Sequence, residues 1–190
     1  MFEWSVGFVS AACVRSQYNR RGAVSMKMSP AAVGDDRFRV FVYGTLKQSY
    51  PNAPLLAEAE FRGRHRTEKK FPLVVGGEYF SPYLLDRAGE GHHVHGEVYL
   101  VNRKTLDFLD EFERVGVNYT RSLIRVHDEA RRPVHVYTYL KCNYTPELLD
   151  SEHMPEYKDT RYVPRHMRGK KMKEPERAEA RVAVPVRVRA

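Results

Sequence analysis

The sequence predicts an α+β domain built on a mostly closed, mixed sheet with few helices. Three observations lead to this fold class. About six short segments of strand-favouring residues are separated by turn residues, only residues 104–113 have a clear helical period, and the sequence contains no repeats. At 190 residues the chain has the length of one domain of ordinary size.

The net charge of +8 comes from the two ends of the chain. Residues 1–39 hold 6 basic and 3 acidic residues, residues 161–190 hold 10 and 3, and the centre, 40–160, holds 16 and 18. The slightly acidic centre lacks the basic face that nucleic-acid-binding domains need, and a basic tail alone gives only weak, salt-sensitive affinity for phosphates. We therefore expect no specific nucleic-acid function.

The cysteine content and the hydropathy indicate where the protein works. Cys13 and Cys142 are too few for a disulfide framework and fit a reducing compartment. No run approaches the roughly 18 consecutive apolar residues of a membrane-spanning helix. We expect a cytoplasmic protein that does not cross a membrane.

Residues 1–37 are an addition to the domain, and we expect them to form a disordered extension. The apolar segment 4–14 is similar to the core of a signal peptide, but the acidic Glu3 and the lack of a basic residue before the segment argue against secretion. The arginines and serines that follow resemble a mitochondrial presequence in composition alone. A translation start at Met26 or Met28 is a third interpretation.

The first strand, residues 40–43, is followed by a loop that can bind an anion. The unbroken run Val-Phe-Val-Tyr is typical of a strand covered on both faces. Gly44 permits a sharp turn and a close approach of the backbone to a ligand. Thr45 and Leu46 then present N–H groups and a hydroxyl, which can hold a carboxylate or a developing oxyanion. From this run alone, an ordinary central strand that ends in a glycine turn is the simpler interpretation.

The other elements follow in order and define a domain over residues 38–160. Residues 54–60 form a short helix or a loop, and residues 61–67 form a charged strand of the kind found at a sheet edge. An aromatic segment is bent at Pro82, and a short helix follows Thr145. From residue 161 onward we expect a basic, disordered tail. Further strands are predicted at residues 71–75, 95–101, 119–127 and 134–140.

The helix predicted over residues 104–113 places one carboxylate on its buried face. At about 100° per residue, Glu113 falls within the apolar arc, whereas the other acids lie on the wet side. Burial and the negative end of the helix dipole both raise the pKa of such a carboxyl, which suits a general base near neutral pH. The alternative is a fraying helix end at which Glu113 pairs with Arg114 or Arg121. The residues that define the arc are Leu106, Phe108, Leu109 and Phe112.

The patterns of other common reaction centres are weak or missing in the sequence. His92, His93 and His95 follow a glycine-rich loop without a second ligand cluster, so a solvated strand entry explains them better than a metal site. Cys142 has no neighbouring histidine or second cysteine and is expected to be an inert thiol. The sequence contains no nucleophile elbow, phosphate-binding loop or dinucleotide fingerprint.

Several short motifs occur in one order along roughly residues 39–145. They are Val40–Lys47, Pro51–Asn52, Phe71–Val74, Gly77–Glu78, Pro82–Leu85, Gly96–Tyr99, Leu106–Glu113 and Tyr119–Arg121. Together they resemble the γ-glutamylcyclotransferase-like superfamily, with the closest similarity to its AIG2-like, γ-glutamylamine cyclotransferase branch. The whole set in the expected order is far more specific than any single motif. Gln48 and Ser49 depart from the resemblance, because close relatives tend to have a basic residue and a glycine there.

The resemblance implies a γ-glutamylcyclotransferase-like mixed β-barrel with a few helices, and an enzyme that uses neither a metal nor a cofactor. It implies that Glu113 is the catalytic acid/base and that Tyr119 lies at the pocket. It also implies that residues 43–46 form the substrate loop, namely Tyr43, Gly44, Thr45 and Leu46.

The reaction that the resemblance implies converts a small γ-glutamyl substrate into 5-oxoproline and a free amine. The α-amine of the substrate attacks its own γ-carbonyl, so the protein supplies no nucleophile. For the γ-glutamylamine branch the implied substrate is γ-glutamyl-ε-lysine. The alternatives are γ-glutamyl amino acids or glutathione-derived compounds, and a non-catalytic interaction protein that uses the same fold.

Overall fold

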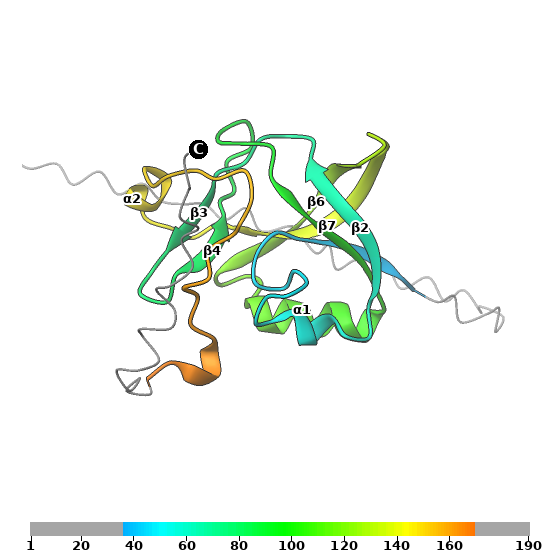
Figure 1. Ribbon diagram of the computed structural model, residues 1–190, viewed down its shortest axis with the longest axis horizontal. Helices are drawn as coiled ribbons and strands as arrows, with labels where there is room; N and C mark the ends of the chain where they lie inside the picture. Colours follow the sequence, from blue (N-terminus) through cyan, green and yellow to red (C-terminus); the bar gives the residue numbers. More distant parts are fainter. Residues whose placement is uncertain (1–35, 170–190) are drawn as a thin grey trace, which may run out of the picture. The chain divides into compact units, whose positions relative to one another are not determined.

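The computed structural model describes residues 36–169 (Figure 1). The expectations for residues 170–190, and nearly all of those for residues 1–37, lie outside these described residues. Five strands close into a mixed barrel in the order β1, β5, β2, β6, β7. Their bounds are β1 Phe38–Val42, β2 Glu60–Thr67, β5 His95–Val101, β6 Tyr119–Asp128 and β7 Pro133–Lys141.

The remaining elements cover the barrel. The strands β3 and β4 form a separate hairpin, which lies with α2 to one side of the barrel, and α1 lies at one end of it (Figure 1). Their bounds are β3 Leu73–Gly76, β4 Ser81–Leu84, α1 Arg103–Glu113 and α2 Pro146–Leu149, with 3-10 turns η1 Ala53–Leu56 and η2 Arg165–Met167. The predicted α+β fold with a closed, mixed sheet is confirmed.

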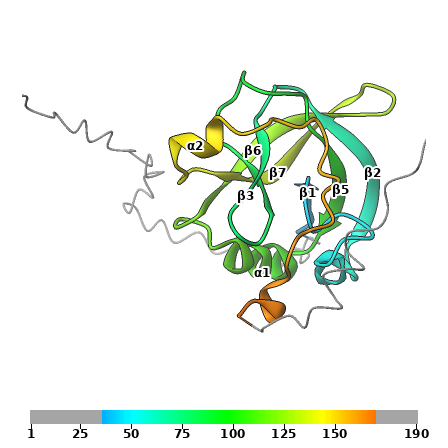
Figure 2. The same cartoon turned by 60° about the vertical axis from the view of Figure 1, so that its left-hand side comes forward.

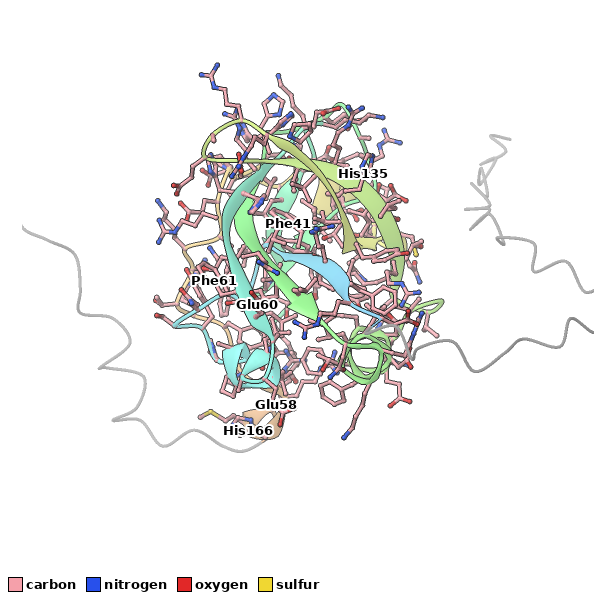
Figure 3. All side chains as sticks on the ribbon, turned by 90° about the vertical axis from the view of Figure 1, so that its right-hand side faces the viewer. Phe41, Glu58, Glu60, Phe61, His135 and His166 are labelled. Atoms are coloured by element: carbon pink, nitrogen blue, oxygen red, sulfur yellow. The ribbon has the colours of Figure 1, made fainter. Side chains whose placement is uncertain are left out.

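The first strand is buried on both faces, as its apolar run predicts. Phe41 packs inside the barrel (Figure 3), in one hydrophobic cluster with Val98 of β5 and Leu73 and Leu84 of the hairpin. Its neighbours Val40 and Val42 belong to a second cluster, which includes two leucines of α1, Leu106 and Leu109. The strand thus separates the barrel interior from the layer under the helix.

The barrel closes between the first and the last of its strands. Val40 of β1 pairs in parallel with Tyr137 of β7. Two side chains of β7 and the loop reinforce this seam: Thr138 donates its hydroxyl to the Phe41 carbonyl at 3.0 Å, and the Tyr43 hydroxyl donates to the Tyr139 carbonyl at 2.8 Å. The loop after β1 is therefore fixed to the last strand of the sheet.

The helix α1 begins and ends at well-formed caps. The side chain of Asn102 accepts the Thr105 N–H at 2.8 Å, and Arg114 closes the helix in the left-handed conformation with φ of 56°. The Arg114 N–H then bonds back to the carbonyls of Asp110 and Glu111. Since the last turn is closed in this way, Glu113 is a true helical residue and the helix end does not fray.

Three predictions are wrong in detail. The strand at 61–67 is not an edge, because the barrel closes and β2 pairs with both β5 and β6. Phe108 is 44% exposed, because the barrel covers only the side of α1 that carries Leu106 and Leu109. The tail predicted to be disordered from residue 161 is ordered to residue 169, where aromatic rings hold its arginines.

No helix within residues 36–169 is both long and apolar enough to cross a membrane. The same part of the chain contains no cluster of three or more histidine, cysteine, aspartate or glutamate side chains placed to hold a metal ion. Of the three histidines near the start of β5, His93 contacts the Thr67 carbonyl through Nδ1 at 3.1 Å and His95 pairs with β2.

Candidate active site

A pocket of about 250 Å³ opens where β1 ends. Five parts of the chain meet around it: the loop after β1, the hairpin β3–β4, the end of α1 with the start of β6, the end of β7, and the segment 161–169. Figure 2 shows this last segment, in orange, descending past β1 and α1. The lining residues used below are Tyr43, Gly44, Thr45, Leu46, Asn52, Pro82, Tyr83, Phe112, Glu113, Tyr119, Tyr139, Lys141, Tyr162, Arg165 and Arg168.

Every site residue predicted from the sequence reaches this one pocket. Residues 43–46, Glu113 and Tyr119 are far apart in the sequence, but all of them line it. Their convergence follows from the closed barrel, which brings the end of β1 beside β7 and beneath the end of α1.

The loop 43–46 is held by hydrogen bonds on both sides. Lys47 donates its N–H to the Gly44 carbonyl at 3.1 Å, and Asn52 donates its N–H to the Thr45 carbonyl at 3.0 Å. The Asn52 side chain also donates to the Thr45 hydroxyl at 2.8 Å. These bonds use the carbonyls and the hydroxyl of the loop, whereas the N–H groups of Gly44, Thr45 and Leu46 donate no hydrogen bond within residues 36–169.

Two residues beyond the loop, a buried carboxylate fixes the backbone at Gln48. Glu97 of β5 is 7% exposed and accepts the Gln48 N–H at 2.8 Å and the Tyr99 hydroxyl at 3.0 Å. Ser49 follows with φ of 66°, a left-handed conformation that favours glycine. The backbone conformation at Ser49 is therefore strained for a residue with a side chain.

Gly44 is required by close packing and not by its backbone angle. A Cβ at this position would lie 2.6 Å from Cγ of Pro82 in the hairpin β3–β4. The loop therefore packs closely against the hairpin at Gly44, with no room for a side chain there.

Glu113 is a carboxyl without an ion-pair partner in the described part of the chain. Burial raises the pKa of Glu113 to about 7, and the positive charge of Arg165 lowers that pKa by a smaller amount. The alternative in which Glu113 pairs with Arg114 or Arg121 is wrong, since Arg121 forms its ion pair with Asp110. At neutral pH the Glu113 carboxyl is therefore near its midpoint and can both accept and donate a proton.

Tyrosine side chains form much of the wall around Glu113. Burial raises the pKa of Tyr43, Tyr119 and Tyr139, so all three are neutral phenols at physiological pH. The hydroxyls of Tyr43 and Tyr139 already have protein acceptors, namely the Tyr139 carbonyl and Asp110. The Tyr119 hydroxyl has no hydrogen-bond partner within residues 36–169 and is available to a ligand.

Asp110 connects α1 to the barrel wall beside the pocket. It accepts the Tyr139 hydroxyl at 2.9 Å and forms an ion pair with Arg121, although its sequence position places it on the wet side of the helix.

Replacing Asp110 with alanine is expected to lower the free energy of unfolding by about 1–3 kcal/mol, because it leaves the partly buried Tyr139 hydroxyl and Arg121 without this acceptor. Chemical denaturation measures this, with Asp107→Ala on the exposed face as the control; equal stability of the two variants would contradict it.

Sequence reasoning missed several residues of the pocket. Tyr139 and Lys141 lie at the end of a predicted strand, where the lining of a pocket has no distinct pattern. Tyr162, Arg165 and Arg168 lie in the segment that we expected to be disordered because of its basic charge. The interleaving of tyrosine, proline and arginine over residues 162–168 is the one signal that could have indicated an ordered segment.

Comparison with known proteins places this geometry in a family. Residues 40–162 match the family model described as "Gamma-glutamyl cyclotransferase, AIG2-like", and this range ends within the segment 161–169. The chain belongs to this family. The residues that match the family model include both the loop 43–46 and Glu113.

Similar relatives and structures agree with the family. A γ-glutamylaminecyclotransferase of Bos taurus is 41% identical over 140 residues, covering 68% of this chain and 83% of the relative. The γ-glutamylaminecyclotransferase of Homo sapiens is 37% identical over 150 residues, with 68% and 98% covered. The crystal structure of an AIG2-like protein from Mus musculus superposes with a TM-score of 0.65 at 37% identity, covering 68% of this chain and 97% of that one.

Proposed function

We propose that this protein is a γ-glutamylamine cyclotransferase, which converts γ-glutamyl-ε-lysine and related γ-glutamylamines into 5-oxoproline and the free amine. The observation that carries the proposal is a partly buried carboxyl with a pKa of about 7, that of Glu113, in one pocket with the unbonded N–H groups of residues 44–46. The proposal is supported by the two curated γ-glutamylaminecyclotransferases at 37–41% identity. We expect the enzyme to act in the cytoplasm.

The proposed reaction is intramolecular, so the pocket has to hold the substrate in the reactive conformation and does not have to supply a nucleophile. The α-amine of the glutamyl group forms a bond to the γ-carbonyl carbon and closes a five-membered ring. The carbon–nitrogen bond to the leaving amine then breaks. Because nucleophile and electrophile belong to one molecule, holding the chain folded already gives a high effective concentration.

In this proposal Glu113 moves the proton. The α-amine enters as an ammonium, which cannot attack until it loses a proton, and the Glu113 carboxylate accepts that proton. The neutral carboxylic acid then returns this proton to the leaving nitrogen as the carbon–nitrogen bond breaks. The ring nitrogen still carries two protons after its attack, and it gives one of them up through Glu113 to the released amine. The lactam nitrogen therefore keeps one proton and the amine leaves as an ammonium. A pKa of about 7 leaves neither transfer strongly uphill.

The loop 43–46 supplies the electrostatic part of the proposal. Attack on the γ-carbonyl produces an oxyanion, and fixed N–H donors stabilise it because they require no reorganisation during the reaction. The N–H groups of Gly44, Thr45 and Leu46 donate no hydrogen bond within residues 36–169, and the neighbouring hydrogen bonds fix the loop that carries them. The Tyr119 hydroxyl is a further donor at the same pocket.

The pH dependence follows from the raised pKa. We expect kcat/KM for γ-glutamyl-ε-lysine to fall below an apparent pKa near 7, because protonated Glu113 cannot accept the ammonium proton. Initial rates of 5-oxoproline release between about pH 5 and about pH 9 measure this limb. An activity that stays constant down to about pH 5 would contradict the role of Glu113 as the base.

The substrate is tested by measuring 5-oxoproline release from γ-glutamyl-ε-lysine, γ-glutamyl-alanine and glutathione. Preferential turnover of the lysine isopeptide supports the proposal. Preferential turnover of either other compound would keep the reaction and replace the substrate. No turnover of any of the three by the folded protein would overturn the enzymatic function and favour an interaction role.

A further inference from the structure

The segment 161–169 brings two arginines to the pocket. The guanidinium of Arg165 lies over the Phe112 ring, 4.5 Å from its centroid, and that of Arg168 lies 4.3 Å from the centroid of the Tyr79 ring. Arg168 also donates from Nε to the Val163 carbonyl at 3.0 Å. Figure 3 labels His166 of this turn at the end of the barrel where α1 lies, away from His135.

The two arginines differ in what they have left to bind. Arg168 is partly buried, and its guanidinium already contacts the Val163 carbonyl of the same segment and the Tyr79 ring. Arg165 is exposed at the pocket mouth, and within residues 36–169 its side chain forms neither an ion pair nor a hydrogen bond. Its neighbour Arg161, by contrast, is paired with Asp159. Arg165 therefore offers a planar fork of donors, held on an aromatic ring, to an anion that enters the pocket.

Arg165 is also close to the candidate base. Phe112, on which its guanidinium lies, directly precedes Glu113, and the charge of Arg165 is the one that lowers the pKa of Glu113. The pocket therefore presents a carboxylate and a guanidinium near each other without joining them in an ion pair within the described residues. Such a pair complements a ligand that carries an ammonium and a carboxylate on one carbon atom.

The glutamyl head of the proposed substrate has this arrangement, since its α-carbon bears both groups. We infer that Arg165 binds the α-carboxylate of the glutamyl head while Glu113 faces the α-ammonium. This inference rests on the proposed function and extends it to a residue of the C-terminal segment. With the carboxylate on Arg165, the N–H groups of residues 44–46 are left for the oxyanion alone.

Lys141 is the rival cation in the pocket. Its ammonium lies 5.1 Å from the Tyr83 centroid and 5.3 Å from the Tyr119 centroid, and burial lowers its pKa. A lysine at this depth is a point charge without the fork that matches a carboxylate. We therefore assign the carboxylate to Arg165, and the experiment includes both residues.

The test compares two ring compounds that differ by one group. 5-Oxoproline carries the α-carboxylate and 2-pyrrolidinone is the same lactam without it, so their affinity ratio measures carboxylate recognition without turnover. Calorimetry on the full chain is expected to show at least about a tenfold preference of the wild type for 5-oxoproline. Arg165→Gln should abolish the preference and Arg165→Lys should restore part of it. Arg161→Gln, which removes the same charge from the same segment outside the pocket, should leave it unchanged.

The outcomes separate this inference from the proposed function. A preference that persists in Arg165→Gln, or that is lost only in Lys141→Gln, would overturn the assignment, and so would a wild type that binds both lactams equally. In each case 5-oxoproline release from γ-glutamyl-ε-lysine by the wild type decides the proposed function by itself. Arg165→Gln should also move the acidic limb of kcat/KM to higher pH, because it removes the charge that lowers the pKa of Glu113.

Discussion

Replacing Glu113 with glutamine is expected to lower kcat/KM for γ-glutamyl-ε-lysine by about 10²–10⁴-fold, the usual contribution of a general acid/base. The amide has nearly the shape of the carboxyl and keeps the packing at the end of α1, but it cannot accept the ammonium proton. Release of 5-oxoproline by the purified variant measures the effect. Glu111→Gln is the matched control, since Glu111 lies two residues away on the exposed face of the same helix.

The same substitution should make the protein more stable above neutral pH. In the folded protein the pKa of Glu113 is about 7, against an ordinary 4.5, so the folded state holds the proton more tightly than the unfolded chain. The stability that the protonated form contributes is fully present below pH 4.5 and is lost as the pH rises through about 7. The shift corresponds to at most roughly 3 kcal/mol, and the access of solvent to the pocket reduces it.

The two readouts together distinguish chemistry from misfolding. We expect Glu113→Gln to be inactive and, at about pH 8, about 1–3 kcal/mol more stable than the wild type, with nearly equal stability at about pH 4. Urea denaturation at both values measures the difference. A folded Glu113→Gln variant that keeps more than about a tenth of the activity would show that another group moves the proton.

Replacing Gly96 with alanine is expected to have the largest effect on stability. A Cβ on Gly96 would lie 2.4 Å from the Val42 carbonyl oxygen and 2.6 Å from Cζ of Phe41. Both belong to β1, which is held by its ladder to β5, so neither can move without opening the barrel. We expect a loss of about 3 kcal/mol or more in the free energy of unfolding, together with lower activity, because the displaced strand carries the loop 43–46.

Gly63 provides the matched control for this substitution. It lies in β2 of the same barrel, with φ of 98° and no heavy atom within 4 Å of the position that an alanine methyl would occupy. Gly63→Ala therefore adds only the strain of a positive φ, about 1–2 kcal/mol. Denaturation of both variants should place the stability of Gly96→Ala well below that of Gly63→Ala; the reverse order would mean that β1 and β5 can separate easily.

The features that could be predicted from the sequence are those encoded in neighbouring residues. The run at residues 40–43 predicts a strand buried on both faces, and the 3.6-residue period of α1 predicts that Glu113 shares a face with Leu106 and Leu109. Both are properties of a single element. The strand is buried as predicted, Leu106 and Leu109 are buried beneath α1, and Glu113 lines the pocket. The helical period also predicts, wrongly, that Phe108 is buried. The period does not show how much of the helix surface the barrel covers.

The features that could not be predicted depend on how distant elements meet. The charged strand β2 resembles an edge, because closure of a barrel leaves no mark on the alternation of one strand. The order of the segment around Arg165 could not be predicted for the same reason. From its sequence this basic, proline-containing segment resembles a solvated tail, and only the folded structure shows that the Arg165 guanidinium lies on the Phe112 ring. Aromatic surface supplied by α1 outweighs the local preference for disorder, and this surface exists only in the folded protein.

The closure of the barrel between β1 and β7 has a consequence for the order in which the protein forms. The hydrogen bond from Thr138 to Phe41 joins residues 97 positions apart, and the one from Tyr43 to Tyr139 joins residues 96 apart. The chain loses much conformational entropy in bringing such distant residues together before their contacts contribute any favourable free energy. Barrels of this kind therefore fold more slowly than helical domains of equal length. The loop 43–46 is thus among the first parts of the domain to leave the ribosome, and we expect it to take its final shape only after β7 pairs with β1. A nascent chain that lacks β7 is expected to lack the pocket, because Tyr139 and Lys141 of β7 line it.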